Sequence, residues 1–241
     1  MNDATLPHLD EDWTRAIAIV AHPDDLEYGA ASAIARWTDH GKWIGYVLAT
    51  SGESGIDGMD PAQAGPLRRD EERAGAARVG VETVEFLDHR DGVVEYGLAL
   101  RRDLARAIRR HRPEVLVLSN FELRWGFGGL NMADHRAVGL AALDAARDAG
   151  NRWVFPELLD EGHEPWSGVR LAAVNASPRP THFVDVGATI DRGIASLTEH
   201  RAYLAGLGNG TDPDEFLRGN AATTGEECGV RYAVEFEVIP L

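Results

Sequence analysis

The residues His22-Pro23-Asp24-Asp25 combine side chains that bind metal ions with side chains that transfer protons, and they directly follow the apolar run of residues 15–21. His22 and Asp25 are three positions apart at a predicted strand-to-helix junction, so both can turn toward one point. A catalytic zinc ion usually takes three nitrogen or oxygen ligands from the protein and leaves a fourth position for water, whose pKa it lowers to about 7. We therefore expect His22 and Asp25 to be metal ligands and Asp24 to be the general base.

A second segment with suitable chemistry, Asp134-His135, lies at the start of the predicted helix of residues 133–150. We expect His135 to be the third metal ligand. Asp134 could accept a hydrogen bond from a ligand histidine, or it could cap the helix. For an isolated HPDD sequence, a simple helix cap would be the preferred interpretation. Its position after a buried strand, together with Asp134-His135 at the end of another strand, favours the metal site.

Strands and helices are predicted to alternate along the chain, which indicates the α/β class with a mostly parallel sheet. Short apolar runs typical of buried strands occupy residues 15–21, 43–50, 81–87, 114–120, 169–176, 182–186 and 232–239. Helical spacing is found at residues 26–40, 67–79, 98–111, 133–150 and 188–206. No linker is evident, so residues 1–241 are expected to form a single domain. Ligands of such folds gather at the carboxyl ends of the strands, where both candidate segments lie. We expect the pocket walls to come from the loop of residues 51–65, the loop of residues 121–132, whose Trp125 and Phe127 could form a rim, and the segment around Trp166.

The composition excludes several classes of function. The chain has 241 residues, of which 44% are hydrophobic, and a formal net charge of −15. This charge argues against nucleic acid or an anionic membrane as the main partner. The single cysteine rules out a disulfide framework and a Cys-rich zinc site. No signal peptide and no apolar run of ~20 residues is present, so we expect a cytoplasmic protein that acts on a small molecule.

Several motifs carry a family resemblance. The run AIAIVAHPDDLEYGAASAIARW resembles the opening of the LmbE-like/PIG-L deacetylase family, whose hallmark is a strand followed by A-H-P-D-D/E. The later NMADHRAVG resembles the family motif H-P-D-H-R-x-x-G. Further motifs are matched in the family's order by the segments Thr50-Ser51-Gly52-Glu53, Arg68-x-x-Glu71, Asp91-Gly92 and His182-Phe183-Val184-Asp185. The resemblance spans nearly the whole chain.

The resemblance implies a Rossmann-like three-layer α/β/α fold and a zinc-dependent N-acetylglucosaminyl deacetylase. Its substrate would be a small molecule bearing an N-acyl group. Zn²⁺ is the implied cofactor, although another divalent metal such as Fe²⁺ would also suit the site, and a homo-oligomer is possible. The implied metal ligands are His22, Asp25 and His135, with Asp24 as the base, in agreement with the residues alone. The resemblance also assigns substrate-binding positions, which are Arg68, Asp91 and His182.

The chain departs from the family at Met132, where the motif has a histidine that stabilises the oxyanion or serves as an acid. Loss of such a donor costs about 2.7–4 kcal/mol if nothing replaces it. Candidate replacements are His182, Asn131, Arg124 and the metal itself. Three functions remain open: a deacetylase acting on an amino sugar or glycoside, a related amidase acting on a non-sugar amide in specialised metabolism, and a metal-binding protein without deacetylase activity.

Overall fold

The computed structural model describes residues 6–126, 128–208 and 210–241, and within them seven strands form one sheet. Five strands are parallel neighbours, in the order β3 (Thr83–Phe86), β2 (Trp43–Leu48), β1 (Arg15–Val20), β4 (Val115–Ser119) and β5 (Leu171–Asn175). The sheet continues through β7 (Ala233–Pro240) to β6 (His182–Asp185), and β7 runs antiparallel to both of its neighbours. The predicted mostly parallel sheet is confirmed.

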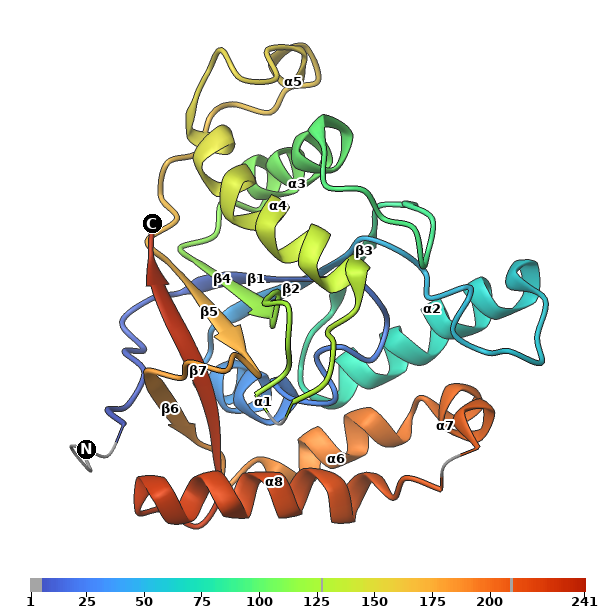
Figure 1. The fold of residues 1–241 in the computed structure, drawn as a ribbon. Coiled ribbons are helices and arrows are strands. Elements are labelled where there is room, and N and C mark those ends of the chain that lie inside the picture. The colour runs from blue at the N-terminus through green and yellow to red at the C-terminus, as the bar shows by residue number, and fades with distance from the viewer. Residues whose placement is uncertain (1–5, 127, 209) are drawn as a thin grey trace.

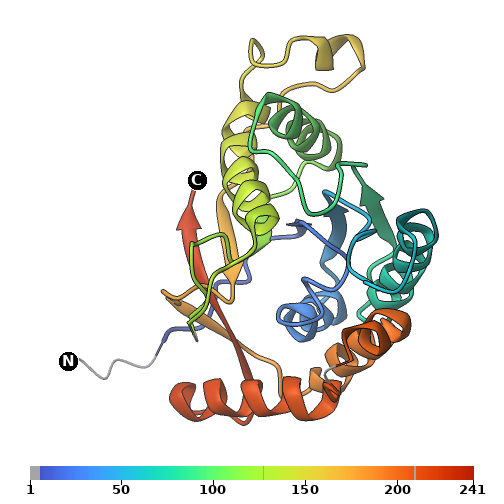
Figure 2. The same ribbon diagram turned by 45° about the vertical axis from the view of Figure 1, so that its right-hand side comes forward.

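Helices cover both faces of this sheet (Figures 1 and 2). One face packs against α3 (Leu98–His111) and α4 (Ala133–Gly150), with α5 (Glu157–Asp160) beyond the end of α4. The other face packs against α1 (Ala31–Asp39), α2 (Pro61–Arg78), α6 (Ile190–Thr198) and α8 (Pro213–Cys228), and α7 (Arg201–Leu207) joins the last two. Alternate residues of β1 enter the two cores: Ala16, Ala18 and Val20 enter one, and Ile17 and Ile19 the other. The three-layer α/β/α architecture is therefore confirmed.

The turn after β1 is longer than the sequence indicated. Helix α1 begins at Ala31 rather than near Leu26, because residues 22–30 form consecutive turns with hydrogen bonds such as Tyr28 N to Asp24 O at 3.1 Å. Asp24 has a φ of 95°, a backbone conformation that is uncommon outside glycine. These turns replace the first five residues of the predicted helix and place the HPDD side chains at the sheet edge.

Three further helical regions differ from the prediction. The long helix expected over residues 188–206 is broken near His200 into α6 and α7. The following segment contains the unpredicted helix α8, whose N-cap Asp212 accepts hydrogen bonds from the amides of Asp214 (2.8 Å) and Glu215 (3.2 Å). Helix α2 begins earlier than predicted, since Asp60 caps it ahead of Pro61. No helix within the described part of the chain is long and apolar enough to cross a bilayer.

Candidate metal centre

The turn after β1 positions its own side chains. The Oδ2 atom of Asp25 accepts hydrogen bonds from the amides of Ala21 and His22, each at 3.0 Å. The second oxygen, Oδ1, is thereby directed toward His135, whose Nε2 lies 3.0 Å away. Strand β4 lies beside β1, with Ile19 opposite Leu118, so the carboxyl ends of both strands meet at one edge. This adjacency brings residues 22–25 and the start of α4 together.

Three potential ligand atoms converge at this edge, as the sequence predicted. The Nδ1 atom of His22 lies 3.2 Å from Nε2 of His135 and 3.8 Å from Oδ1 of Asp25. Tetrahedral coordination with bonds of about 2.1 Å holds ligand atoms about 3.4 Å apart. The observed separations of 3.0–3.8 Å fit such an ion. Burial opposes charge on Asp25, but the His135 and His22 side chains hold its pKa well below its usual range.

His135 is oriented by a residue whose role the sequence did not reveal. The Nδ1 atom of His135 lies 2.9 Å from Oδ1 of Asn131. The Nδ2 group of Asn131 donates to the carbonyls of Asn120 at 2.7 Å and Glu122 at 3.0 Å, which fixes the amide. With Nδ1 bonded to the Asn131 oxygen, the Nε2 atom of His135 faces the centre. Such supporting partners are usual for histidine ligands, but nothing in the sequence pattern marks this asparagine.

His22 is held in the same way by two carboxylates. Its Nε2 atom lies 3.1 Å from Oδ1 of Asp91 and 3.3 Å from Oδ2 of Asp134. Asp134 also accepts hydrogen bonds from the amides of Gly92 and Val94, and it does not cap α4, because the N-cap position is Met132. Burial lowers the pKa of His22, but the carboxylates of Asp134, Asp25 and Asp91 outweigh it and raise this pKa well above the usual value.

Asp24 lies beside the ligands within a buried polar network. Its Oδ1 accepts from Nη2 of Arg68 at 3.0 Å, and its amide donates to Oε2 of Glu72 at 3.2 Å. The hydroxyl of Tyr203 also bonds to its carboxylate. Burial raises the pKa of Asp24 to about 6, against the opposing effect of Arg68. A carboxylate with a pKa near neutrality suits a general base.

Arg68, which the resemblance linked to substrate binding, is engaged chiefly with the protein. Its guanidinium donates to the carbonyls of Gly52 (3.1 Å) and Pro23, and it stacks on the ring of Tyr203 at 4.1 Å. Gly52 has a φ of 61°, and a Cβ there would lie 2.4 Å from the guanidinium, so this close approach requires glycine. Arg68 still borders the cavity, together with Asp91.

A third set of potential ligands, Glu27, Glu72 and His200, is buried behind Asp24. Burial raises the pKa of Glu27 to about 8 and that of Glu72 well above its usual value. Burial, with Arg68 nearby, lowers the pKa of His200 to about 3. None of these three side chains borders the cavity, whereas His22, Asp25 and His135 all line it. The centre formed by His22, Asp25 and His135 is therefore the better candidate for a catalytic ion.

The centre opens into a cavity of about 900 Å³. Parts of both predicted loops, including Ser54 and Trp125, line it, and Met132 contributes a side chain that is 52% exposed. The expected contribution of Trp166 is wrong, because its indole donates to the Pro113 carbonyl elsewhere. The sequence did not predict that α8 forms part of the cavity wall. Phe127, an expected rim aromatic, lies outside the described residues.

The structure does not bring His182 to this cavity. It begins β6 at the far side of the sheet, and its Nδ1 lies 2.9 Å from the Thr181 hydroxyl. Of the other possible substitutes for the missing histidine, Asn131 is fully occupied, as described above. Arg124 does not border the cavity. The remaining predicted residues, which are His22, Asp24, Asp25, Arg68, Asp91, Asp134 and His135, all meet at the centre.

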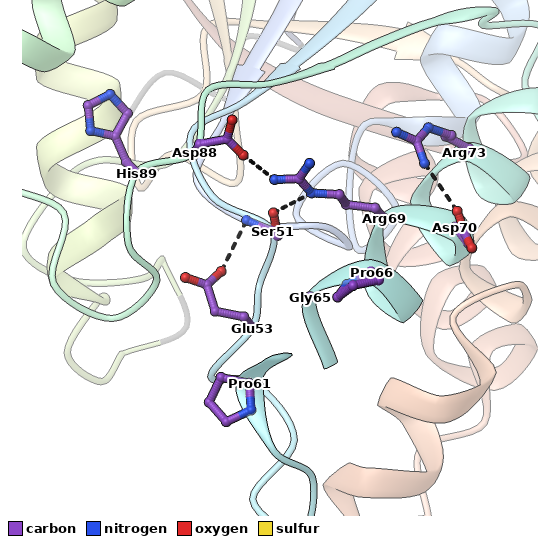
Figure 3. Close-up of a pocket in the computed structure, with 10 residues that line it drawn as sticks. All are labelled: Ser51, Glu53, Pro61, Gly65, Pro66, Arg69, Asp70, Arg73, Asp88 and His89. Carbon is purple, nitrogen blue, oxygen red and sulfur yellow. Dashed lines mark hydrogen bonds and ion pairs between the residues drawn. The ribbon is translucent and has the colours of Figure 1, made fainter. Parts of the chain in front are cut away.

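A smaller hollow of about 460 Å³ is lined by Ser51, Glu53 and residues of α2 (Figure 3). Arg69 donates to the Ser51 hydroxyl at 2.6 Å and pairs with Asp88, and Arg73 pairs with Asp70 at 3.1 Å. Each cation in this hollow thus faces a carboxylate. None of the potential metal-ligand groups found among the described residues borders it, so the larger cavity is the candidate site.

Comparisons with known proteins agree with this geometry. The "Diacetylchitobiose deacetylase" of Thermococcus kodakarensis is 27% identical over 232 residues, covering 95% of this chain and 84% of that protein. An "Uncharacterized deacetylase" of Escherichia coli is 38% identical over 171 residues, covering 66% of this chain and 87% of that protein. The solved structure of the N,N'-diacetylchitobiose deacetylase from Pyrococcus horikoshii superposes with a TM-score of 0.85 at 26% identity, covering 95% of this chain and 85% of that one.

The family comparison covers the part of the chain that builds the metal centre. Residues 17–146 match the family described as "PIG-L: GlcNAc-PI de-N-acetylase", and this stretch includes all three candidate ligands and Asp24. The solved deacetylase structure named above shares the fold over 95% of this chain. The chain therefore belongs to the PIG-L family of de-N-acetylases.

Proposed function

We propose that this protein is a metal-dependent hydrolase that removes the N-acetyl group from an amino sugar or a glycoside of one. The convergence of His22, Asp25 and His135 beside Asp24, at the end of a 900 Å³ cavity, carries the proposal. Membership of a de-N-acetylase family and similarity to diacetylchitobiose deacetylases support the same substrate class. We propose Zn²⁺ as the cofactor, with Fe²⁺ as the alternative that an N/O ligand set also accepts.

The donor set fits a divalent cation because it offers two imidazoles and one carboxylate, supported by Asn131, Asp91 and Asp134. Bound there, the ion would supply a Lewis acid that polarises the amide carbonyl and acidifies water. Asp24 takes the proton of the attacking water and passes it to the leaving nitrogen, so that acetate and a free amine result. Arg68 and Glu72 keep Asp24 in place during both transfers.

Met132 lowers the expected rate. Its thioether is a weak acceptor and donates no hydrogen bond, and neither His182 nor Asn131 offers a substitute in the cavity. A deacetylase with this centre is therefore expected to turn over more slowly than one with a donor at this position. The presence of Met132 also makes a metal-binding protein without hydrolase activity the second candidate function.

The test is release of amine and acetate from a panel containing N-acetylglucosamine, its glycosides, diacetylchitobiose and non-sugar N-acetyl amides. We expect hydrolysis of the sugars, loss of the activity on chelation and its return with Zn²⁺ or Fe²⁺. Hydrolysis of only the non-sugar amides would identify the related amidase. Stoichiometric metal with no turnover of any compound would identify the binding protein. The single-domain organisation over residues 1–241, a homo-oligomer and a cytoplasmic location remain predictions.

A further inference from the structure

The cavity has two parts of different chemistry. The part at the metal centre is polar, with His22, Asp24 and Asp91 among its lining residues. The other part lies along α8, whose lining side chains include the apolar Phe216, Leu217 and Ala221 and the polar Asn220, Thr223 and Thr224. We call this part the α8 arm and define it by six lining residues: Tyr28, Ile190, Phe216, Leu217, Ala221 and Val234. Four different elements contribute to it, so the arm is a feature of the folded chain and not of one helix.

The arm reaches from the molecular surface into the interior. Ile190, Leu217 and Ala221 line it although they are only 4–7% exposed, so they form its inner wall. Phe216 is 39% exposed and meets the edge of the Tyr28 ring at a centroid distance of 5.6 Å and an interplanar angle of 86°. Tyr28 belongs to the turn that carries Asp24, so this ring contact joins α8 to that turn.

Polar groups also line the arm, and some of them are used by the protein itself. The Nδ2 group of Asn175 donates to the Glu235 carbonyl at 3.1 Å, and the hydroxyl of Thr223 donates to the Gly219 carbonyl at 3.1 Å. The side chains of Asn220, Thr224 and Glu235 remain on the wall of the cavity. Against the inner wall formed by Ile190, Leu217 and Ala221, a second sugar ring would lose water contacts without gaining hydrogen bonds, which is costly. An alkyl or aryl group gains free energy there, in proportion to the apolar area that it buries.

We propose that the α8 arm binds an apolar aglycone, so that the preferred substrate is an N-acetylamino sugar linked to an alkyl or aryl group. This proposal rests on the deacetylase function proposed above. The cavity volume of about 900 Å³ lies near the upper end for small-molecule sites, which leaves room beyond one sugar. The aglycone takes no part in the reaction: water cleaves the acetamide C–N bond, and the acetyl group leaves as acetate.

The first experiment compares kcat/KM for N-acetylglucosaminides that differ only in the aglycone (hydroxyl, methyl, hexyl and phenyl), together with diacetylchitobiose. We expect the hexyl and phenyl compounds to exceed the methyl compound by about tenfold or more, mainly through KM. Equal values across the series, or a preference for diacetylchitobiose, would overturn the α8 arm proposal while leaving the deacetylase function intact. If no compound is hydrolysed, the proposed function fails, and calorimetric binding of the same glycosides to the metal-loaded protein still tests the arm.

The second experiment uses variants of the arm. Phe216→Ser removes an exposed wall residue, and Ala221→Leu fills the inner part. We expect both to reduce the phenyl-to-methyl ratio of kcat/KM, or of affinity, to within about threefold of unity. Leu140→Ser on α4 is the matched control, because Leu140 is 47% exposed and lies outside the cavity, and it should keep the wild-type ratio. Unchanged ratios in both arm variants would show that the aglycone binds elsewhere.

Discussion

Replacement of Asp24 by asparagine tests the central assignment with little disturbance of the fold. Asp24 has a φ of 95°, and asparagine is among the few residues that tolerate positive φ. The amide oxygen can still accept from Arg68, and the backbone contact with Glu72 is unaffected. Arg68 also keeps its carbonyl acceptors on Gly52 and Pro23. We therefore expect Asp24→Asn to fold and to bind metal through unchanged ligands.

The expected loss is in the chemical step. General base catalysis contributes about 10²–10⁴-fold, which corresponds to about 2.7–5.4 kcal/mol of barrier. Asp24→Asn should lower kcat by this factor and leave KM nearly constant, as measured by acetate release at saturating substrate. Metal analysis of the same sample shows whether the centre is still loaded. Wild-type turnover in a variant that retains its metal would refute the assignment of Asp24 as the base.

Asp88→Asn is a matched control for this substitution. Asp88 also has a positive φ, of 60°, and also pairs with an arginine, Arg69, but it borders the smaller hollow and its side chain is 73% exposed. We expect its kcat to equal that of the wild type. A comparable loss in both variants would indicate a general effect of removing an arginine partner and not the loss of a base.

Three other predictions concern single side chains. Tyr203→Phe removes the hydrogen bond to the Asp24 carboxylate. Because hydrogen bonds to charged groups are worth about 1.5–3 kcal/mol, kcat should fall roughly ten- to hundredfold with metal content unchanged. An unaltered kcat would exclude a role for this hydroxyl. Met132→His should raise kcat by at least about tenfold, because it places a donor in the cavity, whereas an equal or lower kcat would mean that the oxyanion is already fully stabilised. Glu11→Gln should lower the free energy of unfolding only above acidic pH. Arg36, His40 and Trp37 outweigh burial and lower the pKa of Glu11 in the folded protein. The contribution of Glu11 to stability is therefore complete above its unfolded-state pKa and is lost as the pH falls through its folded-state pKa. Urea unfolding at pH 7 and near pH 3 checks this, and an equal difference between the two proteins at both pH values would contradict it.

The sequence predicts the parts of the site that depend on local pattern and on topology. HPDD follows a buried strand, and Asp134-His135 begins a helix after another one, so the rule for ligand positions in parallel sheets suffices to join them. The structure confirms the adjacency of β1 and β4 on which this inference depends. The sequence could not decide whether Asp134 caps α4 or contacts a histidine, because an aspartate at this position is compatible with both roles. The structure decides in favour of the contact with His22.

Other features depend on contacts that no local pattern encodes. Glu72 bonds to the amide of Asp24 from 48 positions away. The Asn131 side chain that orients His135 is itself fixed by the carbonyls of Asn120 and Glu122, which lie 11 and 9 positions away. Helix α8 was missed because its apolar residues are few and Gly219 and Gly225 interrupt it, although Asp212-Pro213 is a typical helix start. His182 matched a motif by spacing, yet the antiparallel insertion of β7 places its strand beyond the reach of the cavity.

The position of β7 has a consequence for how the chain acquires its active form. Residues 233–240 fill the space between β5 and β6, so these two earlier strands cannot be joined into one sheet until β7 has been synthesised and docked. Four residues separate α8 from β7, and the two pack together, so the α8 wall of the cavity is expected to form in the same step. Hydrogen exchange during refolding should therefore protect β6, β7 and α8 together.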